Sequence, residues 1–140
     1  MKKIIIIFVS IFLFSCAGTG AKSDSYIPEL DSGEQTSGKI MVLRDTGWTA
    51  GAQVISVKLN GQEISQLRPK QIVVSDSVDG ENELLANYTG ISAIGVTGAE
   101  VSFQSDGTQN HYFLITQKDN LFGLTVALSE VSEQTFRNTR

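Results

Sequence analysis

Few side chains in this 140-residue chain are suited to covalent or metal chemistry, and Cys16 is the most informative of them. Cys16 is the only cysteine and His111 is the only histidine. A lone cysteine cannot form a disulfide within its own chain, so in an exported protein it needs another explanation. Covalent modification of the thiol supplies one.

The residues before Cys16 have the order of a secretory signal. Met1-Lys2-Lys3 is positively charged, residues 4–14 are apolar apart from Ser10, and the small residue Ser15 comes directly before the cysteine. Charge, apolar stretch and small-residue cleavage site in this order are typical of export signals. The apolar stretch would span about 16 Å as a helix, against about 30 Å for a bilayer core, so we do not expect a permanent transmembrane helix.

This segment resembles the signal of bacterial lipoproteins, in which the cysteine thiol is acylated and the signal is cut just before it. The resemblance implies cleavage between Ser15 and Cys16, with diacylglycerol and palmitate chains on Cys16 that hold the protein stably in a membrane. Ala17, in place of an Asp, implies the outer membrane of a two-membrane bacterium, facing the periplasm or the cell surface. The alternative is an ordinary secretory signal with a coincidental cysteine.

The remaining candidates for chemistry favour structural roles. His111 starts an apolar stretch beside Tyr112, and no G-x-S-x-G nucleophile motif accompanies it. Residues 76–83 concentrate carboxylates, but Val78 occupies the third position, where a calcium loop of the EF-hand type would supply a ligand. We therefore expect a solvated turn there, and we predict no catalytic residue, metal or cofactor.

Trp48 is the best candidate for a contact with a partner or ligand. It lies in residues 45–51, which read as a loop, and exposed loop aromatics often anchor partners. The alternative is that Trp48 closes one end of the core. Arg44, just before this loop, is expected to pair with an acid such as Asp45 or Glu130.

The elements that must position these residues are short strands. From residue 39 onward, apolar runs alternate with turn signals containing Gly, Pro, Asn and Asp, which predicts an all-β fold, a small antiparallel β-sandwich over residues 39–140. The apolar runs are residues 40–43, 54–59, 72–74, 84–88, 101–103, 112–115 and 124–131. Residues 132–137 predict a short C-terminal helical turn, with Phe136 packed on the sheet. Residues 89–99 fit either a bulged edge strand or a loop.

Asn60-Gly61 is the clearest local signal. Both residues tolerate the positive φ that a two-residue type I′ hairpin requires. Such a turn would set Leu59 opposite Gln62, Lys58 opposite Glu63 and Val57 opposite Ile64. The pattern then predicts Leu59, Val57, Ile55 and Ile64 in the core, with Lys58, Ser56, Glu63 and Ser65 toward water.

Between the signal, residues 1–15, and the sandwich, residues 16–38 read as the lipidated cysteine and a flexible tether. Their Gly, Ser and Thr content would give a coil about 25 Å long on average. Tyr26, Ile27 and Leu30 are its apolar residues, able to dock on the domain or on a partner. Without residues 1–15 the chain has 9 basic and 15 acidic residues, a formal charge of −6, so net charge predicts repulsion from nucleic acid and from anionic lipid.

The order of motifs resembles the bacterial lipoproteins of the domain of unknown function 2846 family. The motifs are a first strand ending in arginine (residues 39–44), an Asn-Gly hairpin (residues 57–61), and Asp106-Gly107 leading to an aromatic strand (residues 111–115). Residues 128–133 complete the resemblance. It implies an immunoglobulin-like or transthyretin-like sandwich and brings no catalytic residues.

Together these observations lead us to expect a non-enzymatic, membrane-anchored lipoprotein that acts as an extracytoplasmic interaction or accessory module. Its partners would be the membrane, through the lipid on Cys16, and a protein; nucleic acid is not expected. The alternative is a lipoprotein that binds a small molecule or glycan through Trp48, Tyr88 or Tyr112.

Overall fold

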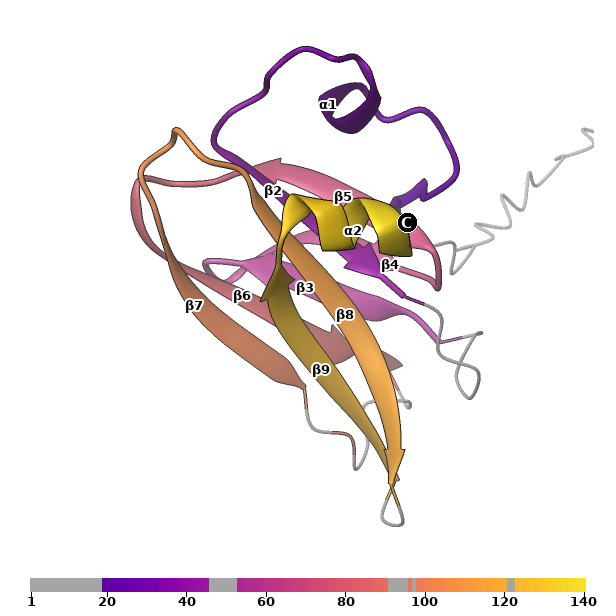
Figure 1. Ribbon diagram of the computed structural model, residues 1–140. Coiled ribbons are helices and arrows are strands. Elements are labelled where there is room, and N and C mark those ends of the chain that lie inside the picture. Colours follow the sequence, from indigo (N-terminus) through magenta and orange to yellow (C-terminus); the bar gives the residue numbers. More distant parts are fainter. Residues whose placement is uncertain (1–18, 46–52, 91–95, 97, 121–122) are drawn as a thin grey trace, which may run out of the picture.

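The computed structural model describes residues 19–45, 53–90, 96, 98–120 and 123–140, and it is a two-sheet β-sandwich (Figure 1). The first sheet has the strand order β1-β5-β2-β8-β9, and the second has the order β4-β3-β6-β7. Neighbouring strands are antiparallel except β2 and β8, which are parallel. The predicted all-β sandwich is confirmed. The strands are β1 (Ala21–Lys22), β2 (Lys39–Arg44), β3 (Ile55–Leu59), β4 (Gln62–Leu67), β5 (Gln71–Asp76), β6 (Gly80–Tyr88), β7 (Ala99–Ser105), β8 (His111–Asn120) and β9 (Gly123–Val131).

The first sheet is buried on both faces, which explains the unbroken apolar runs of its central strands. In β2, Ile40 and Val42 face the core between the sheets, while Met41 and Leu43 belong to a second apolar cluster. Strand β8 repeats this division, with Phe113 on the inner side. Because side chains alternate along a strand, a run without polar residues requires a cover on each face.

Two short helices cover the outer face of the first sheet: α1 (Pro28–Asp31) and α2 (Glu133–Thr139) (Figure 1). The predicted C-terminal helical turn is confirmed, since Phe136 is fully buried and its ring lies 5.3 Å from that of Tyr112. Ser132 caps α2 by accepting a hydrogen bond from the Thr135 amide. Such a cap satisfies one of the unpaired amides of the first helical turn.

The Asn60-Gly61 hairpin is confirmed, with φ of 51° and 80° at the two residues. Leu59 pairs with Gln62 and Lys58 pairs with Glu63 as predicted. The predicted pairing of Val57 with Ile64 is wrong: a bulge between Val57 and Lys58 shifts the register.

The bulge also changes which residues face water. Val57 pairs with Ser65, and Ile64 packs against the core only in part. Ser65 is buried, contrary to the expectation, because one extra residue in β4 reverses the facing of the residues that follow. Ser56 is also buried rather than exposed, and its hydroxyl donates to the Glu63 carboxylate.

The prediction of a flexible tether is wrong for residues 19–32. Residues 19–32, called here the N-terminal strap, lie on the sandwich: Ala21 and Lys22 form β1 beside β5, and Ile27 and Leu30 are buried in the second apolar cluster. The apolar face of β2 and β8 requires a cover, and the strap supplies part of it. Of residues 89–99, the described ones before Ala99 lie outside strands.

Candidate functional site

The two residues singled out for function, Cys16 and Trp48, lie outside the described residues. Their assignments as lipid attachment site and contact residue therefore stay predictions. The described residues next to them in the chain still constrain what each can do. Thr19 follows Cys16 by three residues, and Asp45 precedes Trp48 by three.

The N-terminal strap closes the seam between the two sheets. The Thr19 amide donates to the Gln66 carbonyl of β4 (2.7 Å), and the Gln66 amide donates to the Thr19 hydroxyl (2.9 Å). Two residues later the strap pairs with β5 of the other sheet. The chain passes so close at Gly20 that a methyl group there would overlap Leu67 and lie 2.9 Å from the Ile72 carbonyl oxygen.

Ion pairing joins the strap to the end of α2. The Arg140 guanidinium donates to both oxygens of Asp31 (2.6 and 2.8 Å), and it also contacts the carbonyls of Ser23 and Ser25. The hydrogen bonds that Asp31 accepts from Arg140 and from the Ile27 amide lower the pKa of Asp31 to about 2. The Asp31 carboxylate in turn raises the pKa of Arg140. The strap is therefore tied to a segment more than 100 residues away.

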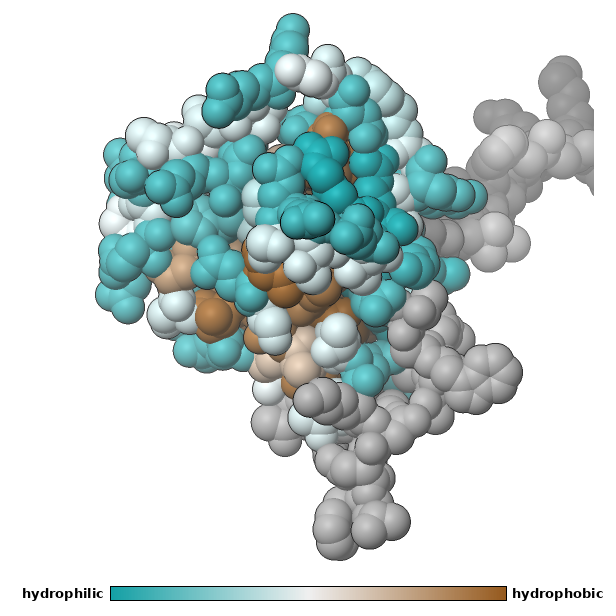
Figure 2. Space-filling view, in the orientation of Figure 1, coloured by the Kyte–Doolittle hydropathy of each residue, from teal (hydrophilic) through white to brown (hydrophobic). Residues whose placement is uncertain are grey.

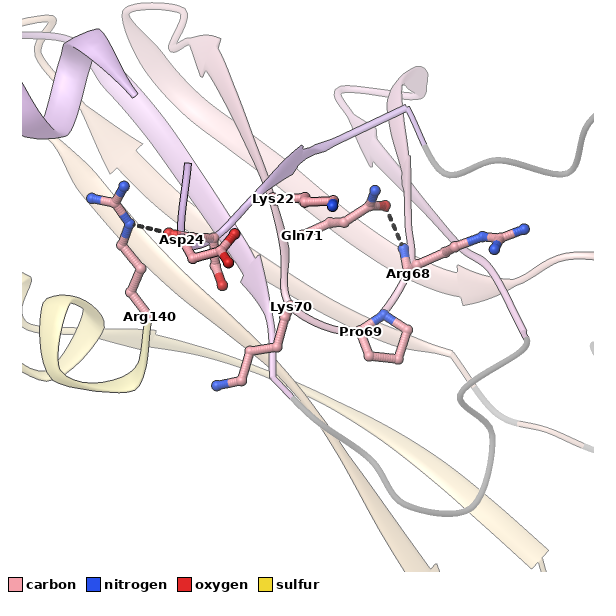
Figure 3. Close-up of a pocket in the computed structure, with 8 residues that line it drawn as sticks. Lys22, Asp24, Arg68, Pro69, Lys70, Gln71 and Arg140 are labelled. Atoms are coloured by element: carbon pink, nitrogen blue, oxygen red, sulfur yellow. Dashed lines mark hydrogen bonds between the residues drawn. The ribbon is translucent and has the colours of Figure 1, made fainter. Parts of the chain in front are cut away.

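Beside the strap lies a surface hollow of about 490 Å³ whose walls are rich in cations, called here the basic hollow (Figure 3). Lys22 comes from β1, Arg68 and Lys70 from the β4–β5 turn, and Arg140 from the end of α2. Lys70 has a φ of 57° and is held by Asp45 (3.1 Å) and the Thr139 carbonyl (2.8 Å). One acid, the exposed Asp24, shares the hollow. Sequence reasoning missed this cluster because its members are distant in the chain.

The opposite end of β5 is acidic. Asp76 ends β5, and Asp79 lies in the turn that follows, close to the neighbouring turn that contains Asp106. Asn82 organises the first turn, since its amide oxygen accepts from the Val78 amide (3.1 Å) and its amide nitrogen donates to the Val78 carbonyl (2.7 Å). Among the described residues, no group of three or more His, Cys, Asp or Glu side chains is placed to hold a metal ion.

His111 is buried against Phe103, with ring centroids 4.7 Å apart, and its Nδ1 lies 2.8 Å from Glu130 Oε1. The imidazole thus packs on the core and pairs across the β8–β9 ladder. His111 thus has a structural role at the start of β8, as the sequence favoured.

Arg44 is fully buried at the end of β2. Its Nη1 donates to the carbonyls of Gln53 (2.5 Å) and Leu67 (2.8 Å), and burial lowers its pKa. The acids proposed as its partners contact other side chains: Asp45 forms an ion pair with Lys70, and Glu130 lies at hydrogen-bond distance from His111.

The tyrosines considered for ligand stacking are both buried. Tyr88 belongs to the core between the sheets, and its hydroxyl accepts a hydrogen bond from Gln117. Tyr112 packs under α2, and burial raises the pKa of its phenol. Neither offers an open ring face of the kind a sugar would stack on.

The edge of the sandwich opposite the strap, called here the distal edge, is formed by β7 and β9. Within the described strands, β7 pairs with β6 alone and β9 with β8 alone, and the two edges lie near each other. Val101 and Leu128 pack on the core there and remain partly exposed. Figure 2 shows apolar surface, in brown, over these strands.

No helix among the described residues is long and apolar enough to cross a membrane. Comparison with protein-family models, curated proteins and solved structures found no match to this chain. The resemblances noted in the sequence thus remain predictions, and a function has to be argued from the fold and its surfaces.

Proposed function

We propose that this protein is a non-enzymatic lipoprotein of the cell envelope, anchored through Cys16, whose sandwich presents its distal edge to a protein partner. Its anchor is the acylated thiol implied by the signal in residues 1–15. Its site of action is the periplasm or cell surface next to the outer membrane.

The observation that carries this proposal is the position of the N-terminal strap. Three residues of extended chain reach at most about 11 Å, so a lipid on Cys16 would keep Thr19 within that distance of the bilayer surface. Thr19 is hydrogen-bonded to β4, at one edge of the second sheet. The distal edge, three strand spacings or about 14 Å across that sheet, would then face away from the anchor.

The distal edge has the features of a site for strand addition. An unpaired edge exposes a row of backbone amides and carbonyls that can bind an extended segment of another protein. Val101 and Leu128 would add apolar contact beside that row. Trp48 is retained as a further candidate contact.

Site-specific photocrosslinking in the native cell tests the partner surface. A photoreactive residue at Ser102 or Ser129, both exposed on the distal edge, should capture one discrete protein. The same residue at Val78, which is 58% exposed on the acidic turn, should not. Equal capture from all three positions would contradict the proposal, as would saturable binding of a glycan or metabolite with no captured protein.

Two variants sharpen this test. Val101→Lys should abolish capture, whereas Ile64→Lys, at the opposite edge and also partly packed on the same core, should preserve it. Trp48→Ala should abolish capture without unfolding if Trp48 is a contact residue. If the Trp48 variant unfolds instead, Trp48 belongs to the core.

The anchor has its own test. Mass spectrometry of the mature protein from native membranes should find an acylated Cys16 at the new N-terminus, and Cys16→Ser should release or mislocalise the protein. An intact, unmodified Cys16 would overturn the anchor.

A further inference from the structure

We infer that the basic hollow is a membrane-contact surface that binds the phosphates of anionic lipid headgroups and thereby fixes the orientation of the domain on the bilayer. This inference rests on the proposed anchor at Cys16. It goes further because it assigns a ligand to a surface of the sandwich itself.

The first argument is the location of the hollow relative to the anchor. Lys22 follows Thr19 by three residues within the strap, and Arg68 follows Gln66, the hydrogen-bond partner of Thr19, by two. Lys22 and Arg68 are thus close in the chain to Thr19 or to its partner, and Thr19 would lie within about 11 Å of the lipidated cysteine.

The second argument is the segregation of charge. Of the 9 basic residues that remain after residue 15, four line the hollow: Lys22, Arg68, Lys70 and Arg140. The four acids Asp76, Asp79, Glu81 and Asp106 lie in or beside the turns at the opposite end of β5, about 17 Å away along that strand. The net charge of −6 predicts repulsion from anionic lipid, and Asp24, Asp31 and Asp45 lie beside the cations of the hollow, but the four acids at the far end of β5 lie away from the anchor.

The third argument is which cations are exposed to a bilayer. Lys70 and Arg140 are held by Asp45 and Asp31, and they shape the walls. Lys22 and Arg68 are exposed, and Figure 3 shows their side chains on either side of that of Gln71. The negative charge of Asp24 partly offsets the charges of Lys22 and Arg68 and weakens their attraction to an anionic bilayer. Binding should therefore depend on a surface dense in phosphate.

Several phosphates presented together suit this surface better than a single free ion. Cations near an anionic bilayer act together through its surface potential, which decays within a Debye length of about 10 Å at 0.1 M salt. The hollow is open to solvent, so it offers charge at a surface and not an enclosed binding cavity.

The test uses the mature, acylated protein in vesicles of phosphatidylcholine with or without phosphatidylglycerol. Because Cys16 is acylated, a cysteine introduced by Pro69→Cys at the hollow or by Val78→Cys at the acidic end is the single free thiol for a fluorescent label. A quencher attached to lipid headgroups should quench the label at residue 69 in phosphatidylglycerol vesicles and leave the label at residue 78 bright.

Removing the charges of Lys22 and Arg68 should reverse this orientation. Each cation near an anionic bilayer changes the ratio of oriented to unoriented protein about fivefold. The double variant Lys22→Gln and Arg68→Gln should therefore lower the ratio of quenched to bright label at residue 69 about 25-fold. The control Lys39→Gln removes a positive charge at the acidic end of β5, where Lys39 pairs with Asp76, and should leave the ratio nearly unchanged. Lys22→Gln alone should give the fivefold change, and circular dichroism checks that each variant is folded.

Three results would overturn the inference: equal quenching at residues 69 and 78, no effect of phosphatidylglycerol, or loss of quenching on adding inorganic phosphate but not chloride of equal ionic strength. The last would identify the hollow as a site for free phosphate. Flotation with the vesicles is measured in every sample, so a protein that floats but is not oriented refutes this inference alone. An unmodified Cys16 in native protein refutes the anchor instead.

Discussion

The strap is part of the folded unit, and Leu30→Ala tests this most directly. Leu30 is 5% exposed, between α1 and the outer face of the first sheet, in a cluster with Met41, Leu43 and Phe136. Truncating a buried leucine to alanine costs about 2–5 kcal/mol. We expect a cost near the lower end of this range, about 2–3 kcal/mol, because α1 is one turn long and lies at the surface. It can therefore shift to fill part of the cavity that the truncation leaves.

The assay is thermal and urea unfolding of the mature chain carrying Cys16→Ser, followed by far-UV circular dichroism. For a domain of this size, 2–3 kcal/mol corresponds to a fall of about 10 °C in Tm. Tyr26→Ala is the matched control, since Tyr26 is four residues away in the same segment and 68% exposed. If Leu30→Ala and Tyr26→Ala agree within about 0.5 kcal/mol, the strap does not belong to the folding unit, and the flexible tether inferred from composition is correct.

Three further predictions concern the turn, the seam and the ion pair. Gly61→Val should lower the free energy of unfolding by about 1 kcal/mol or more, because a β-branched residue opposes the φ of 80° there; urea unfolding checks this, with Gln62→Val as control. Gly20→Ala should cost about 1–3 kcal/mol in the same assay, because the added methyl overlaps Leu67, whereas Ala21→Ser at the next, exposed position should be neutral. Asp31 has a pKa lowered from 3.8 to about 2, so its pairing with Arg140 stabilises the fold above about pH 4 and is lost as the pH falls toward 2. Limited pepsin digestion should therefore begin to cut the strap within that interval, and Asp31→Asn, unlike Asp24→Asn, should be cut already at pH 4; a strap equally resistant in both variants would contradict the role of the ion pair.

Local sequence determined the parts of the fold that depend on nearest neighbours. Asn60 and Gly61 tolerate positive φ, so the hairpin and its first two pairs followed from two residues. Ser132 was correctly placed at the start of the C-terminal helix, where its hydroxyl caps the first turn. The third pair of the hairpin was wrong because a bulge depends on how β4 meets the rest of the core, and a two-residue turn carries no signal for it.

The tertiary structure alone decided where the strap lies and what gathers beside it. Ile27 and Leu30 have no periodicity that predicts an element, and their burial depends on the outer face of β2 and β8. The unbroken apolar run of residues 40–43 was the signal available, since it required a cover on both faces of the sheet. Arg68 and Arg140 stand far apart in the chain, and they line one hollow because a turn and a helix end meet there. Packing brings these residues together, so neither composition nor net charge predicts that they are close.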